Sequence, residues 1–420
     1  MPTAVADSDY PDRRVPGHAR RSTFSLAVVI AGFIFYTPTM VTAGSVAPSF
    51  GFASFLLYAG IAAGVLAVYV GLLSVVSAKT GLTTVLLARL AMGRLGGKWA
   101  SLILGGTQVG WYAITIGLLG RLVADMFGWE ASWPIVVLGG VLMASTAYVG
   151  FKGIEILSWI AIPLMLTLCV MVLVGSLQET GGPAGLLAVE GTGETTPGLA
   201  ITLMIGAFVS GGTQIGNWAR FDGGTAGRVF ALSALALFSV HSAMLFFGGI
   251  GAIAYGEPDF VSLLATMGLL GAALILLVAN MWTTNDNAAY AFGVAGAELL
   301  EIKSKSPSIV GGVVIAIILA LTGIADSMSG FLILVGVLIP PLGGVLLGTF
   351  FVAWRGKDTG EDLQGVPLLR LPGTAAYLAG VAVAWFCNTQ GIGSPAVLGI
   401  LVGAGVAAVC GLVTHRSAVD

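Results

Sequence analysis

Long apolar runs separated by short polar breaks make up almost the whole chain. No charged side chain occurs from Ser22 to Ala78, which is enough chain for two membrane-crossing helices of about 20 residues each. Similar runs follow, and together with the breaks they predict twelve spans. The spans cover residues 24–46, 52–76, 99–126, 133–151, 155–176, 198–218, 229–255, 261–297, 308–325, 329–353, 371–388 and 394–413. This pattern is typical of an all-α polytopic membrane protein.

Composition supports a membrane protein and excludes several other classes. Charged residues are 9% of the 420 residues, against about a quarter in soluble domains, and the mean hydropathy is +0.98. The net charge of -2 gives no basis for nucleic-acid binding. The three cysteines lie inside apolar spans and the three histidines are scattered, so we expect neither disulfides nor a metal cluster. Residues 1–22 lack a cleavage site and are expected to form a retained cytoplasmic tail.

The distribution of lysine and arginine tests the span count independently. With the amino terminus inside the cell, seventeen of the eighteen basic residues fall in cytoplasmic segments, and only Arg121 falls outside. Removing one span would invert every later loop and destroy this positive-inside bias. We therefore expect twelve spans with both termini cytoplasmic. Basic and apolar residues mixed over 79–98 also predict a short interfacial helix on the cytoplasmic side.

Two spans contain residues that interrupt a helix. The first carries Gly32, Tyr36 and Pro38, and the sixth carries Gly211 and Gly212. Proline removes a backbone hydrogen bond, and glycine lowers helix preference. We therefore predict that spans one and six are discontinuous.

The positions of these two spans indicate an internal repeat. Spans one and six are equivalent if residues 23–176 and 198–353 are five-helix repeats of opposite topology, followed by two additional helices in 354–420. Discontinuous helices at matching positions of inverted repeats indicate a secondary transporter, because the freed backbone groups bind solute and ions. The alternative is that glycine and proline are simply frequent in membrane helices.

The eighth span contains a polar run, Asn280-Met281-Trp282-Thr283-Thr284-Asn285-Asp286-Asn287. A carboxylate at the centre of a membrane helix costs about 2.5 to 3.5 kcal/mol on insertion scales. Packing alone rarely justifies that cost, so we expect a polar site for a solute or an ion at mid-membrane depth. The alternative is a set of ordinary hydrogen bonds between helices.

Several longer strings resemble bacterial members of the first nucleobase-cation symporter family. They are Ser77–Thr84, Leu87–Arg89, Leu104–Trp111, Trp282–Asn287 and Ile339–Gly344. The likeness covers most of the chain. It implies ten core helices in two inverted repeats plus two more, in the bacterial cytoplasmic (inner) membrane. It also implies coupled uptake of a nucleobase, cytosine first among them, with sodium or a proton, and no organic cofactor.

The resemblance further implies which residues form the site. It assigns base binding to Gln108, Trp111, Phe208, Ser210 and Asn280. It assigns the sodium ion to backbone carbonyls of Gly32, Phe35 and Asn280 and to the hydroxyls of Thr283 and Thr284.

The chemistry of these side chains suits a neutral planar base. Aromatic rings stack on a base for about 1 to 3 kcal/mol, and amides donate and accept at its edge. Gln108 and Trp111 are three residues apart and share a helix face. Phe208 and Ser210 are two apart, so we expect span six to unwind there to bring both to one site. Hydroxyl and carbonyl oxygens suit an alkali cation.

Several alternatives stay open from the sequence. Asp286, with Asn285 beside it, is expected first to support the site and second to carry a proton as the coupling ion. Tyr36–Met40, Gly211 and Gln214 depart from the family pattern near the site. Uracil, hydantoin or allantoin therefore remain candidate substrates, since a rotated amide exchanges donor and acceptor. A channel or an enzyme is the other class, and the spans show no filter motif and no nucleophile with a base.

Overall fold

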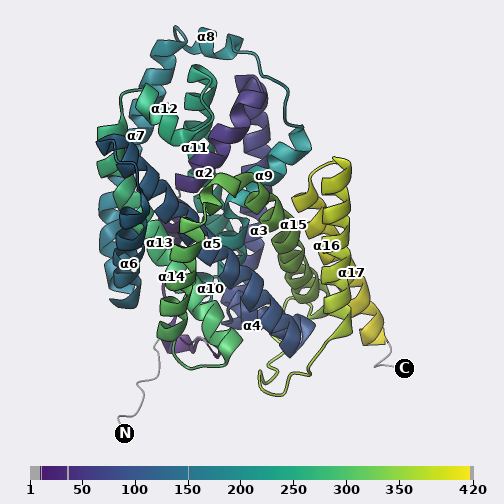
Figure 1. Cartoon of the computed structure of the whole chain (residues 1–420). Helices are drawn as coiled ribbons and strands as arrows, with labels where there is room; N and C mark the ends of the chain where they lie inside the picture. The colour runs from purple at the N-terminus through teal and green to yellow at the C-terminus, as the bar shows by residue number, and fades with distance from the viewer. Residues whose placement is uncertain (1–9, 11, 36, 150, 417–420) are drawn as a thin grey trace.

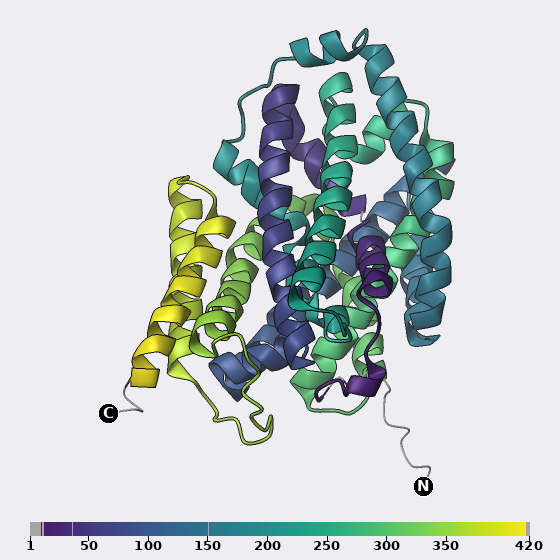
Figure 2. The same ribbon diagram turned by 180° about the vertical axis from the view of Figure 1, so that it is seen from behind.

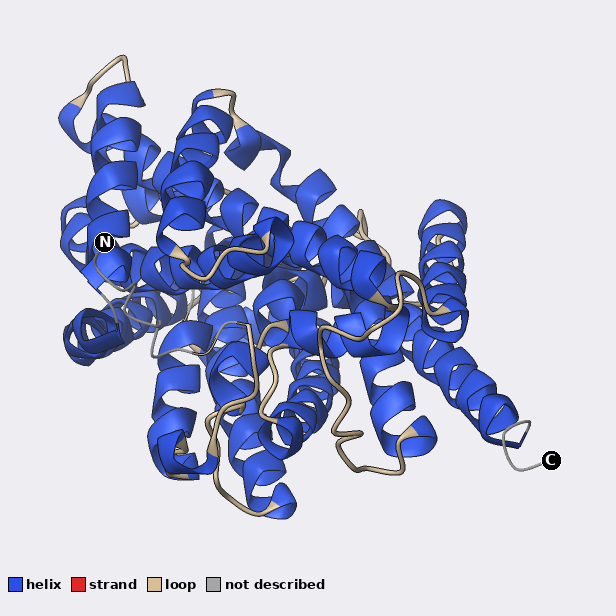
Figure 3. Ribbon diagram, turned by 90° about the horizontal axis from the view of Figure 1, so that it is seen from below, coloured by secondary structure: helices blue, strands red, loops and turns tan. Residues whose placement is uncertain are grey.

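The structure is helical throughout the described chain (Figures 1 and 3). This computed structural model describes residues 10, 12–35, 37–149 and 151–416, and in them it contains helices and loops but no strand. Helices in or at the predicted spans are α1 (Thr23–Ile34), α2 (Thr37–Val46), α3 (Phe52–Thr80), α5 (Arg94–Phe127), α6 (Trp133–Val149), α7 (Phe151–Glu179), α9 (Pro197–Thr213), α10 (Gly216–Ala219), α11 (Ala226–Tyr255), α13 (Leu270–Leu300), α14 (Ser306–Leu321), α15 (Met328–Gly348), α16 (Leu371–Gln390) and α17 (Pro395–Arg416). Shorter helices are α4 (Thr84–Met92), α8 (Pro183–Ala188) and α12 (Phe260–Thr266), with short helical turns at 17–19, 47–49, 324–327 and 349–353.

The all-α class is confirmed, and the described helices fit a membrane. Six helical segments, one of them α9 and α10 taken together and another α15 with its flanking turns, are long and apolar enough to cross a bilayer, and the bent α1–α2 pair is a seventh. The count of twelve spans stays a prediction. One predicted span, 261–297, is divided into α12 and α13. Gly268 takes φ 69° between them, and the amide of Leu269 donates to the carbonyl of Leu264, a glycine-based helix ending.

The helices pack as two groups with a third set beside them (Figures 1 and 2). The first group contains α1, α2, α3, α9, α10 and α11, and the second contains α5, α6, α7, α13 and α14. Helices α15, α16 and α17 pack together and meet the first group through α9, and α16 and α17 form one edge of the molecule. Any site between the first two groups therefore lies where a relative movement of the groups would open it.

The segments rich in basic residues gather at one end of the molecule. Helix α4, the 17–19 turn, the loop from 354 to 370 and the carboxyl end of α17 lie at the lower end in Figure 1, opposite α8 and α12. The short helix predicted in 79–98 is present as α4, but it is buried in the protein and does not lie on its surface. Eight of the nine residues of α4 are buried, all except Arg89, because α4 packs against α5 and α16.

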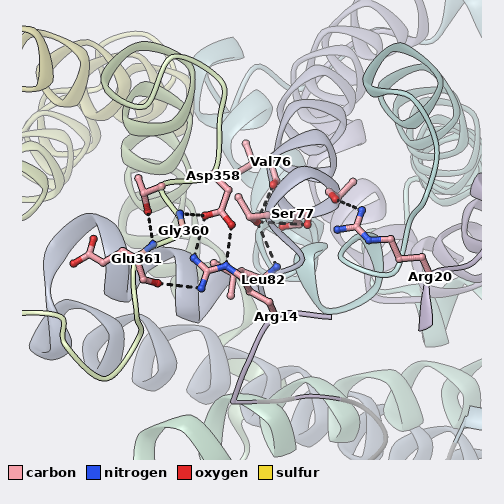
Figure 4. A network of polar contacts seen from close by, with 11 residues as sticks. Arg14, Arg20, Val76, Ser77, Leu82, Asp358, Gly360 and Glu361 are labelled. Atoms are coloured by element: carbon pink, nitrogen blue, oxygen red, sulfur yellow. Dashed lines mark hydrogen bonds and ion pairs between the residues drawn. The ribbon is translucent and has the colours of Figure 1, made fainter. Parts of the chain in front are cut away.

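A strap formed by residues 14–23 crosses this lower end (Figure 4). The backbone of Val15 donates to the carbonyl of Gly81 at 2.9 Å, and that of Arg21 donates to the carbonyl of Phe221 at 2.7 Å. The guanidinium of Arg14 donates to both carboxylate oxygens of Asp358 at 2.8 and 3.0 Å. The strap thus connects the ends of α3 and α10 with the loop before α16.

The first interrupted helix breaks as predicted, immediately before its proline. Helices α1 and α2 meet at an angle of 50°. Phe35 follows α1, Tyr36 lies outside the described residues, and Pro38 is the second residue of α2. A proline in the first turn of a helix loses no intrahelical bond, so it starts α2 at no cost. We call this junction the first break.

The second interruption lies later than predicted and is slighter, because α9 and α10 together still form one span, Pro197–Ala219. Helix α9 continues through Gly211 and Gly212 to Thr213, and the chain leaves the helix only at Gln214 and Ile215. The expected unwinding at Phe208 to Ser210 is therefore wrong. The two glycines serve close packing: an added Cβ would lie 2.9 Å from the Phe33 ring at Gly211 and 2.8 Å from Val70 at Gly212. We call the 214–215 junction the second break.

Candidate functional site

A small cavity lies between the first and second groups of helices. The first group contributes Phe33, Ala207, Phe208, Ser210 and Gly211, and the second contributes Gln108, Trp111, Thr284 and Ala288. We call this cavity the pocket. Its volume is about 10 Å³, the space of about one water molecule. None of these described lining residues is charged, so the pocket is suited to an uncharged solute and must widen to admit one.

Polar lining residues of the pocket bind one another. The hydroxyl of Ser210 accepts from Nε1 of Trp111 at 2.9 Å and from Nε2 of Gln108 at 3.4 Å. All three side chains are buried. A ligand that separates the two groups would release these donors and take over their hydrogen bonds. The sequence prediction that these three residues share one location is confirmed as geometry, while their role stays a prediction.

Phe208 and Ser210 both reach the pocket from an unbroken helix. Successive residues turn about 100° around a helix axis, so Ala207 and Gly211 lie near the middle of the face toward the pocket. Phe208 and Ser210 then lie on its two sides. Because Ala207 and Gly211 are small, the two larger side chains extend around them. Unwinding is not needed to bring them together.

The structure adds Phe33 to the aromatic side of the pocket. Its ring lies 5.1 Å from that of Phe208 in an edge arrangement and 4.6 Å from that of Trp218. The Trp111 ring meets Phe331 edge-on at 5.0 Å. Phe33 lies next to Gly32, two residues before the first break, and this was the signal in the sequence that could have found it.

Asn280 links α13 to the first break. Its Nδ2 donates to the carbonyl of Phe35 at 2.6 Å, and its Oδ1 accepts from the backbone and hydroxyl of Thr37 at 3.2 and 2.6 Å. The amide is 1% exposed. It therefore satisfies backbone groups that the break leaves without helical partners. Asn280 is not among the residues that line the pocket, and its predicted contact with a base stays a prediction.

Of the predicted sodium ligands, the structure joins Phe35 and Asn280 at the first break. The hydroxyl of Thr283 donates to the carbonyl of Asn280 at 2.8 Å, and the carbonyl of Phe35 is bound to the Asn280 amide. Gly32 lies one turn earlier in α1. The Thr284 hydroxyl is buried, lines the pocket and has no hydrogen-bond partner among the described residues. These oxygen donors fit a small alkali cation, and an unpaired buried hydroxyl is the kind of group that a ligand satisfies.

Asp286 and Asn285 lie beyond these ligands along α13. Asp286 is fully buried, and it follows Thr284 by about 200° around the helix, so it lies on the side away from the pocket. Asn285 is also buried, and its Nδ2 donates to the sulfur of Met143 at 3.3 Å. This placement favours support of the helix over direct contact with solute.

The second break is held by three side chains that the sequence did not single out for this role. The hydroxyl of Thr84 donates to the carbonyl of Thr213 at 2.6 Å, and the hydroxyls of Tyr69 and Thr213 share a hydrogen bond of 2.6 Å. Gln214 donates from Nε2 to the carbonyl of Leu104 at 3.1 Å. The buried carboxyl end of α9 thus receives partners from α3, α4 and α5.

A larger, charged cavity lies near the ends of α4 and α13. It measures about 350 Å³ and is lined by residues that include Asp12, Arg89, Arg94, Glu298 and Glu301. We call it the charged vestibule. Arg89 and Glu298 form an ion pair of 3.2 Å across it. Lys98 binds Glu301 at 3.0 Å, and this hydrogen bond holds the pKa of the Glu301 carboxyl below its usual value.

Comparison with known proteins gives the family. Residues 14–366 match the family described as permeases for cytosine/purines, uracil, thiamine and allantoin. The chain is 33% identical over 349 residues to the cytosine permeases of Escherichia coli K12 and O157:H7, which covers 83% of this chain and 82% of theirs. The chain belongs to this permease family. The permease is therefore a multi-pass membrane transporter and not an enzyme, and the resemblance found in the sequence is confirmed.

Solved structures share the fold of the permease. Mhp1, a nucleobase-cation-symport-1 family transporter, was solved closed with bromovinylhydantoin bound. It matches with a TM-score of 0.83 at 14% identity, over 97% of this chain and 96% of that one. A Na+-coupled sialic acid symporter in an outward-open state matches with a TM-score of 0.70 at 13% identity, over 98% and 92%. At such identities the likeness concerns the fold alone.

Proposed function

We propose that this permease imports cytosine together with sodium by alternating access, across a bacterial inner membrane with both termini in the cytoplasm. The observation that carries the proposal is the uncharged pocket between two groups of helices, which is lined by Thr284 of α13 and by Phe33, two residues before the first break. The relatives named cytosine permease support the choice of base. Residues 23–176 and 198–353 would form the inverted repeats.

Base recognition follows from the pocket's own contacts. Separation of the two groups frees the donors of Gln108 and Trp111 from the Ser210 hydroxyl. An amide donor and acceptor then match the edge of a neutral pyrimidine, and Trp111 and Phe208 cover its faces. Stacking stabilises a bound base by about 1 to 3 kcal/mol. This gain compensates for the hydrogen bonds to Ser210 that are lost when the pocket opens.

Coupling follows from the place of the sodium ligands. An ion bound by the carbonyl of Phe35 and the hydroxyls of Thr283 and Thr284 would hold the first break against α13. The same ion would fix the positions of α1 and α13 at the pocket, because Phe33 of α1 and Thr284 of α13 line it. Sodium and base then favour the same arrangement, and each raises the affinity of the other by the same factor.

Uptake into proteoliposomes tests the proposal. With an inward sodium gradient we expect labelled cytosine to accumulate, and with choline replacing sodium at fixed pH we expect accumulation to stop. Uptake that is unchanged in choline but follows a pH gradient would instead support proton coupling, with Asp286 as the first candidate. Absence of saturable accumulation under every gradient would contradict a symporter.

A thermal-shift panel identifies the base. Cytosine with sodium should raise the melting temperature, because a ligand that binds only the folded state stabilises it. Gln108→Leu should abolish this shift, whereas Gln178→Leu, at an exposed position of α7, should keep it. A larger shift with uracil, hydantoin or allantoin would reassign the substrate.

A further inference from the structure

Gln214 carries a buried polar atom that the site described above does not use. The side chain is 1% exposed, and while its Nε2 binds the carbonyl of Leu104, its Oε1 has no partner among the described residues. The hydroxyl of Ser101 is in the same situation at 2% exposure. Leaving such a group unpaired costs about 1 to 3 kcal/mol. Two of them close to one segment of α5 call for an explanation.

Both groups lie along one stripe of α5. Gln108, Leu104, Ser101 and Gly97 follow one another at spacings of four, three and four residues, which places them on one helix face. The stripe begins at the pocket with Gln108. It ends at Gly97, where an added Cβ would lie 2.7 Å from Cβ of Arg89. Arg89 in turn lines the charged vestibule.

Helix α9 places Gln214 opposite this stripe. The amide of Gln214 donates to the carbonyl of Ser210 at 3.2 Å, so Gln214 lies one turn beyond the pocket residue Ser210. Its side chain contacts Leu104, which lies one turn from Gln108 in the same direction. The Gln214–Leu104 contact therefore repeats the Ser210–Gln108 contact one level closer to the vestibule.

We propose that Gln214 and Ser101 form a second, transient station for the base on its way from the pocket to the charged vestibule. The station offers a free amide oxygen and a hydroxyl and no charge, which suits the amino or ring N–H group of a neutral nucleobase. Neither Gln214 nor Ser101 is aromatic, so the station offers hydrogen bonds without stacking, binds weakly and lowers the barrier to release. The inference rests on the proposed function.

Gln214→Met and Ser101→Ala test the station. Methionine keeps the length of glutamine and removes its hydrogen bonds, and alanine removes one hydroxyl from a buried position. We expect equilibrium binding of cytosine to change less than about twofold. In Gln214→Met, the rate of cytosine exchange should fall about three- to tenfold. The apparent affinity for cytosine added from the vestibule side, measured in inverted membrane vesicles, should fall by a similar factor. Both effects should be smaller in Ser101→Ala. Ser242→Ala, which removes a comparable unpaired hydroxyl from α11, should match the unchanged protein.

The outcomes separate the station from the function. If the unchanged permease moves cytosine and both variants exchange it at the normal rate, the station is wrong and the function stands. If Gln214→Met alone is slow and also melts earlier, Gln214 serves only to hold the second break, and the station is again wrong. If Gln214→Met weakens the equilibrium binding of cytosine as strongly as it slows exchange, Gln214 belongs to the pocket and the station is wrong as well. If the unchanged protein neither binds nor moves any base, the proposed function falls first.

Discussion

The two breaks were expected to be equivalent, yet they are held in different ways. At the first break, one amide, Asn280, crosses from the second group of helices to bind Phe35 and Thr37. At the second break, the carbonyl of Thr213 is bound by Thr84, and its hydroxyl by Tyr69, which lies on α3 in the same group. Gln214 also donates to the carbonyl of Leu104 on α5. The first break therefore depends on a single side chain from the second group, whereas the second break is held by side chains on three different elements.

This difference assigns different roles to the two junctions. A contact next to the expected sodium ligands would respond to a bound ion, because the proposed ion site and the Asn280 amide share the carbonyl of Phe35. The second break is held by Tyr69 of α3, Thr84 of α4 and a contact of Gln214 with α5, so it depends less on any single contact. Two breaks that the sequence pattern made equivalent are thus supported differently. The following four variants test the contrast.

Asn280→Leu should have the largest effect. It removes all three side-chain hydrogen bonds at the first break, so the free energy of unfolding should fall by about 2 to 4 kcal/mol and sodium-driven uptake should be lost. Denaturation and uptake in proteoliposomes measure the two effects. Asn287→Leu is the matched control, since that amide binds its own helix through the carbonyl of Thr283. Normal uptake by Asn280→Leu would show that the first break needs no support from α13.

Thr84→Val should destabilise the protein without changing its ligand affinity. The carbonyl of Thr213 loses its hydroxyl donor in a buried place, at a cost of about 1 to 3 kcal/mol. Sodium-dependent binding of the base should stay within about twofold, which isothermal titration measures. Thr80→Val, whose hydroxyl donates within its own helix to Val76, should cost less. A larger loss of affinity than of stability would erase the contrast between the breaks.

Thr37→Val should shift the response to sodium. The change removes the 2.6 Å bond to Asn280 and leaves the backbone bond in place. Because one bond of about 0.5 to 1.5 kcal/mol is removed, half-maximal activation should need about two- to tenfold more sodium. Thr42→Val in the same helix removes a bond to Pro38 and should not shift it. An altered base affinity in the absence of sodium would point to another cause.

Tyr69→Phe should have the smallest effect. It deletes one hydroxyl from the second break, while Thr213 keeps its other bond, to the carbonyl of Val209. We expect about 1 kcal/mol less stability and unchanged uptake kinetics, measured by the same denaturation and transport assays. A change in transport rate at unchanged stability would show that this junction also responds to ligand.

The sequence predicted those features that depend on local pattern. Apolar runs located the helices, and Pro38 located the first break because proline acts on its own backbone. The second break was misplaced because Gly211 serves contact with Phe33, while the carbonyl at the true end of α9 is bound by Thr84, more than a hundred residues away. Resemblance to a family located Gln108, Trp111, Phe208 and Ser210, but not the pairing of Arg89 with Glu298. Contacts between distant segments leave no periodic signal along the chain.

Three backbone amides at the amino-terminal strap would report on relative movement of the helices that the strap joins. Its backbone joins α3 and α10 through the amides of Val15 and Arg21, and the amide of Gly223 donates back to the carbonyl of Arg21 at 3.1 Å. Arg14 extends the connection to Asp358, outside the first group. Deuterium uptake at these three amides would therefore stay slow while the first group turns as one unit, and would quicken only if α3 and α10 separate.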